Sequence, residues 1–188
     1  MISYWNPVPE ARRIVAALDR DPFEGDWSQR NPRNVPGPFY TGETDIMQMG
    51  RNDAPRHICN DDAIDSTTGF EFVFRQPMTP AEVADLVSAA QIELNSGYAL
   101  DGDDHWTPEA VRDWWAGRAG LRRWAIDLAV AWAANSHPEY HRHYHDAAQG
   151  LRDLVAFLDD GMESYLRGYL FWLRERREPA PTDRIPAL

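Results

Sequence analysis

Residues 146–177 have the sequence DAAQGLRDLVAFLDDGMESYLRGYLFWLRERR, which carries a long helical pattern near the end of the chain. Its apolar residues recur at alternating spacings of four and three, the pattern of a buried stripe on one face of a helix. The members of this stripe are Leu151, Val155, Leu158, Met162, Tyr165, Tyr169 and Trp172. The pattern predicts one long helix that organises the chain. Within it, Gly161 and Gly168 each cost about 1 kcal/mol relative to alanine, so we expect another element to pack closely there.

Three earlier segments carry recognisable helix starts. Thr79-Pro80-Ala81-Glu82 and Ser136-His137-Pro138-Glu139 each place a hydroxyl residue at the N-cap and Glu three residues later, as in a capping box. Thr107-Pro108 begins another helix, which Gly117 and Gly120 are expected to break or kink before it resumes. The helix that opens at residue 136 is expected to run into the long one.

The strand candidates lie in the first half of the chain. They are Thr44–Met49, Arg56–Asn60 and Phe70–Arg75. In the last segment Phe70, Phe72 and Phe74 alternate with other residues, so they share one face of a strand. A small antiparallel sheet follows from this pattern.

The predicted fold is a single α+β domain over residues 1–188. It is predominantly helical: an aromatic-rich helical bundle with a small two- or three-stranded antiparallel sheet. The expected parts are a helix at 7–19, an ordered loop at 23–42, the sheet at 44–75, a helical core at 79–177 and an extended tail at 179–188. A chain of this length buries about 70% of its unfolded surface as one domain.

Charge and composition exclude several functions. Nineteen basic residues against thirty acidic ones give a net charge of −11, which disfavours nucleic acid as a partner and suits a basic protein. Every basic residue is Arg. Without lysine, a Walker A loop, a Schiff-base enzyme and a protein kinase of the usual kind are excluded.

The single cysteine, the N-terminal residues and the longest apolar stretch indicate the cellular compartment. Cys59 is the single cysteine, so an intrachain disulfide and a cysteine-rich metal site are excluded. The N-terminal residues do not form a signal peptide, and the longest apolar stretch, 125–134, is too short to span a bilayer. We therefore expect a cytoplasmic protein without membrane contact.

Two acidic stretches are the candidate partner-binding sites. Residues 43–65 contain six acids against two arginines, and residues 101–106 combine acids with a tryptophan. An acidic turn and favourable charge before a helix N-terminus explain these stretches without any partner; an acidic face for a basic partner is the functional interpretation. The candidate residues are Asp61, Asp62, Asp65, Asp101, Asp103, Asp104 and Trp106.

Four of the six histidines lie within residues 137–145. On a helix, His137, His141 and His145 would share one side at four-residue intervals, as divalent-metal ligands do. The His-Glu-x-x-His motif of zinc proteases is absent. A polar helix start near the surface explains the cluster equally well, and no cofactor is our first expectation.

Nucleophile motifs are missing, because no serine lies in Gly-x-Ser-x-Gly and Cys59 adjoins a strand-like Ile58. A third possibility beside simple core packing is an aromatic-lined pocket for a small molecule, formed by Trp114, Trp115, Trp124 and Tyr165.

Several stretches resemble a group of actinomycete proteins that has no established activity. They are residues 36–45 (PGPFYTGETD), 70–77 (FEFVFRQP), 101–108 (DGDDHWTP) and 169–173 (YLFWL). The resemblance covers most of the chain and transfers no catalytic or binding residue. In size, acidity and aromatic content the chain is also similar to bacterial toxin-immunity proteins.

These observations predict a non-enzymatic, acidic protein-binding module, such as an immunity or inhibitor protein for a basic partner. The alternative is a metal-dependent enzyme or metal-binding protein that uses the histidines of residues 137–145.

Overall fold

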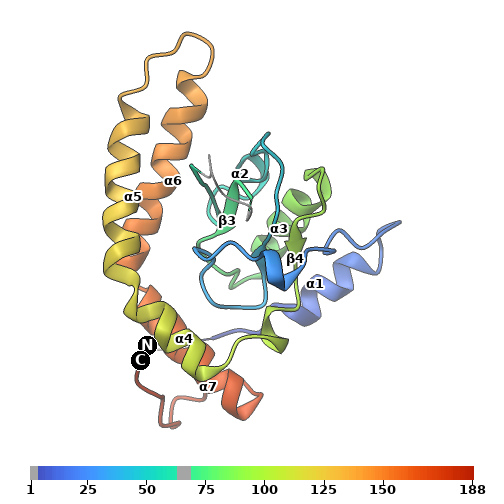
Figure 1. The fold of residues 1–188 in the computed structure, drawn as a ribbon. Helices are drawn as coiled ribbons and strands as arrows, with labels where there is room; N and C mark the ends of the chain where they lie inside the picture. Colours follow the sequence, from blue (N-terminus) through green and yellow to red (C-terminus); the bar gives the residue numbers. More distant parts are fainter. Residues whose placement is uncertain (1–3, 63–68) are drawn as a thin grey trace.

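The computed structural model describes residues 4–62 and 69–188 (Figure 1). In these residues, seven α-helices accompany two antiparallel sheets of two strands each. The predicted helical α+β class is confirmed. The helices are α1 (Val8–Val15), α2 (Gly50–Asp53), α3 (Pro80–Ile92), α4 (Pro108–Ala116), α5 (Arg118–Ala133), α6 (His141–Asp159) and α7 (Met162–Glu175). The strands are β1 (Tyr40–Thr41), β2 (Ile58–Asn60), β3 (Glu71–Val73) and β4 (Tyr98–Ala99), and two short 3-10 helices cover Trp27–Gln29 and Gly102–Asp104.

The β2–β3 pair separates two apolar cores. Its register sets Cys59 opposite Phe72 and Ile58 opposite Val73, and neighbouring residues of a strand point to opposite faces. Cys59 and Phe72 pack into a core with α4 to α7, whereas Ile58 and Val73 join a core with α1 and α3. Figure 1 shows this order, with α5 and α6 on one side of β3 and α3 and α1 on the other. Both faces of the pair are therefore buried.

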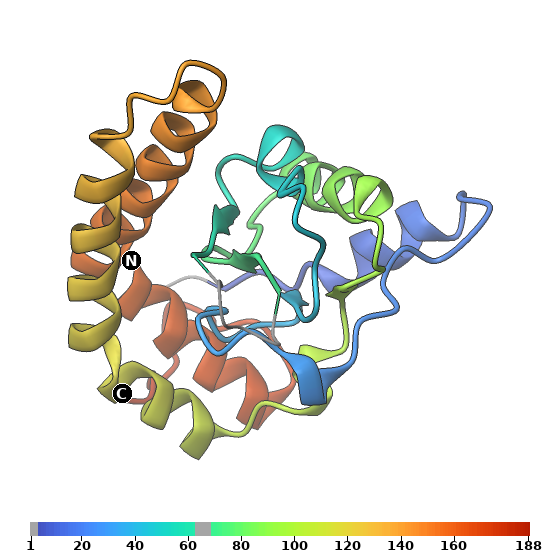
Figure 2. The same cartoon turned by 45° about the horizontal axis from the view of Figure 1, so that its top comes forward.

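The single long helix predicted for residues 146–177 is wrong, because the structure divides it into α6 and α7. Gly161 has φ +111°, a backbone conformation that side chains other than glycine rarely adopt. The apolar stripe nevertheless continues through the break, since Leu158 and Met162 both face the same core. As a result α6 lies along α5, whereas α7 turns to pack against α4 (Figure 2).

Two helix starts follow the sequence signals. The Thr79 hydroxyl accepts a hydrogen bond from the Glu82 backbone N–H (3.3 Å), and the Thr107 hydroxyl accepts one from Ala110 (3.2 Å). Gly117 separates α4 from α5 as predicted. The capping box at 136–139 is wrong, because residues 138–140 form a turn and α6 begins only at His141.

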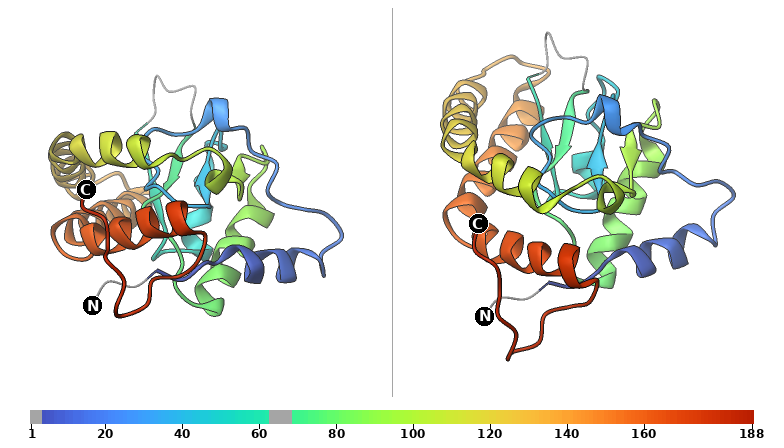
Figure 3. Two further views of the ribbon diagram at one scale, coloured as in Figure 1. Left: turned by 90° about the horizontal axis from the view of Figure 1, so that it is seen from below. Right: turned by 60° about the horizontal axis from the view of Figure 1, so that its bottom comes forward.

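The strands also differ in part from the prediction. Segment 44–49 is irregular instead of extended, whereas β1 pairs with β4 through residues expected to lie in loops. The tail after α7 returns along that helix (Figure 3). There Arg167 donates a hydrogen bond to the Pro186 carbonyl (2.9 Å), and Arg112 donates one to the Ala187 carbonyl (3.3 Å). Among the described residues, every helix is too short or too polar to cross a membrane.

Candidate functional site

The carboxylate of Asp61 is buried and belongs to an internal ion pair. Arg33 Nη1 lies 2.6 Å from Asp61 Oδ2, and Asn31 Nδ2 donates to the same oxygen at 2.9 Å. Burial raises the pKa of Asp61, while the bond from Asn31 and the charge of Arg33 oppose that rise. Asp61 therefore does not contribute to a partner-binding face. Asp62 is half-buried, and Asp65 lies outside the described residues.

The second predicted acidic stretch is also divided between surface and interior. Trp106 is buried and packs edge-to-face on Trp27, with ring centres 5.3 Å apart. Asp103 accepts a hydrogen bond from the Tyr169 hydroxyl at 2.8 Å, and burial raises the pKa of Asp103 to about 6. Asp104 is exposed. Trp106 is thus part of the fold's interior and Asp103 is half-buried, so neither contributes to a fully exposed acidic face.

Asp101 remains accessible, and it connects to the chain around residue 27. It accepts a hydrogen bond from the Tyr40 hydroxyl (2.8 Å), and its other oxygen lies 3.2 Å from His105 Nε2. The His105 ring stacks on Trp27 at 4.7 Å. Asp101 is therefore held beside the segment that carries Asp26, whose own pKa falls because the Ser28 backbone N–H donates to its carboxylate.

The three predicted histidine ligands do not share one helical face. His137 precedes α6 and packs on Tyr140, with ring centres 4.8 Å apart. His141 and His145 lie on α6, with ring centres 6.2 Å apart. Throughout residues 4–62 and 69–188, His, Cys, Asp and Glu side chains form no group of three or more placed to hold a metal ion. The predicted metal site is not assembled in this arrangement.

A surface that the sequence did not reveal carries most of the large exposed apolar side chains of the described residues. Among the described residues, eight large apolar side chains are exposed, and five of them come from two segments, 46–49 and 92–94. Ile46 is 73% exposed and Leu94 is 76% exposed. Single exposed apolar residues are ordinary, but a group of them marks an interaction site.

Two carboxylates tie these segments to each other. Glu93 Oε1 accepts a hydrogen bond from the Asp45 backbone N–H (2.7 Å), and Asp45 Oδ2 accepts one from the Leu94 N–H (2.9 Å). Glu93 Oε2 also accepts from Gly97 N–H at 2.6 Å. These exchanged bonds satisfy backbone groups that would otherwise need a strand partner. They hold Leu94 next to the 45–49 segment.

Gln48 fixes the other end of the 45–49 segment. Its φ of +52° is uncommon for a residue with a side chain. The Gln48 side-chain amide donates hydrogen bonds to the carbonyls of Asp61 (3.0 Å) and Phe70 (3.2 Å). These bonds explain why the strained backbone is retained, and they attach the 45–49 segment to the ends of β2 and β3.

An acidic hollow adjoins the apolar group. It has a volume of about 330 Å³ and is lined by Glu24, Asp26 and Glu43 together with residues 95–97. All three carboxylates are exposed, and no arginine lines the hollow. We name this combined region the acidic–apolar surface. Its defining residues are Glu24, Asp26, Glu43, Ile46, Met47 and Leu94.

Comparison with protein-family models, curated proteins and solved structures gives no match to this chain. Of the features above, the acidic–apolar surface combines exposure, a concave shape and a single sign of charge.

Proposed function

We propose that this chain is a non-enzymatic protein-binding module for a basic protein, acting as an immunity or inhibitor protein in the cytoplasm. The observation that supports this most directly is the acidic–apolar surface. Exposed Ile46, Met47 and Leu94 supply area that gains about 1.5–3 kcal/mol per side chain on full burial. The neighbouring carboxylates supply attraction and orientation for a positively charged partner.

The proposed contact has an apolar centre and a charged margin. A few well-packed side chains near the centre of an interface carry most of the binding energy, whereas exposed charges at its margin mainly raise the association rate. Glu24, Asp26 and Glu43 surround a hollow suited to an arginine or lysine side chain. The partner is therefore a protein that presents a cationic side chain beside an apolar group.

The test uses the basic proteins encoded by genes adjacent to this one. Each is expressed and titrated against the full chain, and a toxic product is also tested for rescue on coexpression. The proposal expects one of them to bind with an affinity that falls as salt concentration rises. If none binds, or if binding is insensitive to both salt and a charge placed at Leu94, the proposal fails.

A further inference from the structure

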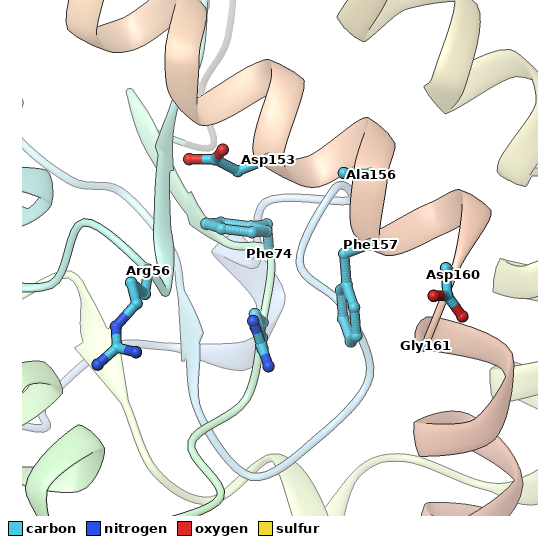
Figure 4. A pocket seen from close by; sticks show the side chains of 8 residues that line it. Arg56, Phe74, Asp153, Ala156, Phe157, Asp160 and Gly161 are labelled. Atoms are coloured by element: carbon cyan, nitrogen blue, oxygen red, sulfur yellow. The ribbon is translucent and has the colours of Figure 1, made fainter.

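A different hollow lies between the β2–β3 pair and α6, with a volume of about 630 Å³ (Figure 4). Arg56 precedes β2 and Arg75 follows β3, so both arginines come from the strand side. Asp153 projects from α6, and Asp160 follows the last residue of that helix. Figure 4 shows Arg56 across the hollow from these two aspartates. The hollow is thus lined by two arginines that flank the strand pair and by two aspartates from α6 and its end.

These charges do not neutralise one another. Within the described part of the chain, the guanidinium groups of Arg56 and Arg75 have neither an ion pair nor a side-chain hydrogen bond, and the Asp160 carboxylate likewise has neither. Asp153 is partly compensated, because its Oδ2 lies 3.7 Å from Arg51 Nη2. The hollow therefore keeps two cationic groups and an anionic group available to a ligand.

Two aromatic rings also line the hollow. Phe74 is buried beneath the hollow, and Phe157 is half-buried on α6. The guanidinium carbon of Arg75 lies 5.2 Å from the centre of the Phe157 ring. A guanidinium over an aromatic ring keeps its N–H edge available for a carboxylate. The half-buried Phe157 ring offers an apolar surface to the body of the same ligand.

We propose that this hollow binds a small amphoteric molecule with an apolar body, such as an apolar amino acid or a short peptide. Arg56 and Arg75 bind its carboxylate, Asp160 binds its ammonium group, and Phe157 packs against its apolar part. A ligand with one charge would leave the opposite side of the hollow uncompensated. The volume lies in the range of small-molecule sites, about 300–1,000 Å³.

The test is a calorimetric titration of the full chain with four probes. L-phenylalanine and glycyl-L-phenylalanine carry both charges at different separations, 3-phenylpropanoate lacks the ammonium group, and 2-phenylethylamine lacks the carboxylate. We expect saturable binding of at least one amphoteric probe, at least about tenfold tighter than either singly charged probe, as one charge-assisted hydrogen bond provides. The better of the two amphoteric probes distinguishes a free amino acid from a peptide.

Variants at exposed positions test which residues bind the carboxylate and the ammonium group of the ligand. Arg56→Ala and Arg75→Ala should each weaken the amphoteric probe about tenfold, and Asp160→Asn should lower its affinity to that of 3-phenylpropanoate. Arg142→Ala, at an exposed arginine on α6 away from the hollow, is the matched control and should change nothing. The inference is overturned if no probe saturates, if a singly charged probe binds equally well, or if the pocket variants bind like the control. Failure here leaves the proposed protein-binding function untouched, because the acidic–apolar surface is separate.

Discussion

Carboxylates of the interior and carboxylates of the acidic–apolar surface differ in their burial and in their hydrogen bonding. Asp61 and Glu71 are buried and Asp103 is half-buried, and all three accept hydrogen bonds from defined donors. Burial is the first cause of the raised pKa of each. These groups hold distant segments together, at the expense of placing a titratable group away from water.

The surface carboxylates have the opposite properties. Glu24, Asp26 and Glu43 are exposed around one hollow. Solvent screens their charges, so they contribute little to stability. Net charge does not distinguish interior carboxylates from surface carboxylates, because both count equally toward −11. We therefore expect changes at the interior acids to alter the free energy of unfolding, and changes at the surface acids to alter partner binding.

The largest effect is expected from Arg33→Met. This change leaves the fully buried Asp61 carboxylate without its guanidinium partner, and breaking such a pair costs about 3–5 kcal/mol of unfolding free energy. Urea unfolding at neutral pH measures it. The double variant Arg33→Met with Asp61→Asn should recover part of the loss. A cost below about 1 kcal/mol, typical of surface pairs, would place Asp61 with the surface acids.

Glu71 should make stability depend on pH. Its carboxylate accepts hydrogen bonds from the Gly50 backbone N–H (2.7 Å) and the Tyr98 hydroxyl (2.9 Å), yet burial raises its pKa from 4.5 to about 7. Because the folded pKa is the higher one, the stabilisation is complete below pH 4.5 and is lost as the pH rises through 7. The loss is about 3 kcal/mol.

Glu71→Gln removes this titration and keeps the side chain's shape. Between pH 4.5 and 8, the unfolding free energy of the unmodified chain should fall relative to that of the variant. Denaturant midpoints across this range provide the measurement. Parallel curves for the two proteins would show that Glu71 does not have a raised pKa.

Asp103 should produce a similar effect in a lower pH window. Burial raises its pKa from 3.8 to about 6. Its stabilisation is therefore complete below pH 3.8 and is lost as the pH rises through 6. The loss is about 3 kcal/mol. Asp103→Asn should become the more stable protein progressively over that window. Thermal melts at several pH values test this, with Asp104→Asn, an exposed neighbour, as the control expected to show no such trend.

The smallest change in stability is expected from neutralising the surface acids. A variant with Glu24→Gln, Asp26→Asn and Glu43→Gln should unfold within about 0.5 kcal/mol of the unmodified chain, as surface substitutions usually do. Its partner association rate should fall and lose salt dependence. Asp127→Asn, on the exposed side of α5, is the control. Marked destabilisation by the triple change would erase the distinction between interior and surface acids.

Local signals predicted the parts of the fold that depend on neighbouring residues. The capping threonines at 79 and 107 were recognisable because the donor and acceptor lie three residues apart. The break at Gly161 was not, because the spacing from Leu158 to Met162 is also that of a continuous helix. A positive φ at glycine leaves no mark in an apolar pattern.

The site was less predictable for a related reason. Asp61 and Glu43 belong to one acidic stretch, but Asp61 is buried by Arg33 and Asn31, which lie 28 and 30 residues earlier in the chain. Likewise Ile46 and Met47 suggested a strand. They are exposed because Asp45 and Glu93, 48 residues apart, exchange hydrogen bonds with each other's segments instead. Such long-range partners cannot be read from composition or spacing.

A comparison of Leu94→Asp with Val130→Asp tests most directly whether the acidic–apolar surface binds the basic partner. Leu94 is 76% exposed on the acidic–apolar surface and Val130 is 66% exposed on α5, so neither change should disturb the fold. Calorimetry with the basic partner measures both affinities. We predict that Leu94→Asp weakens binding at least about tenfold, the equivalent of about 1.4 kcal/mol, whereas Val130→Asp binds like the unmodified chain. Equal affinity of the two variants, or a loss confined to Val130→Asp, would show that the acidic–apolar surface does not bind the partner.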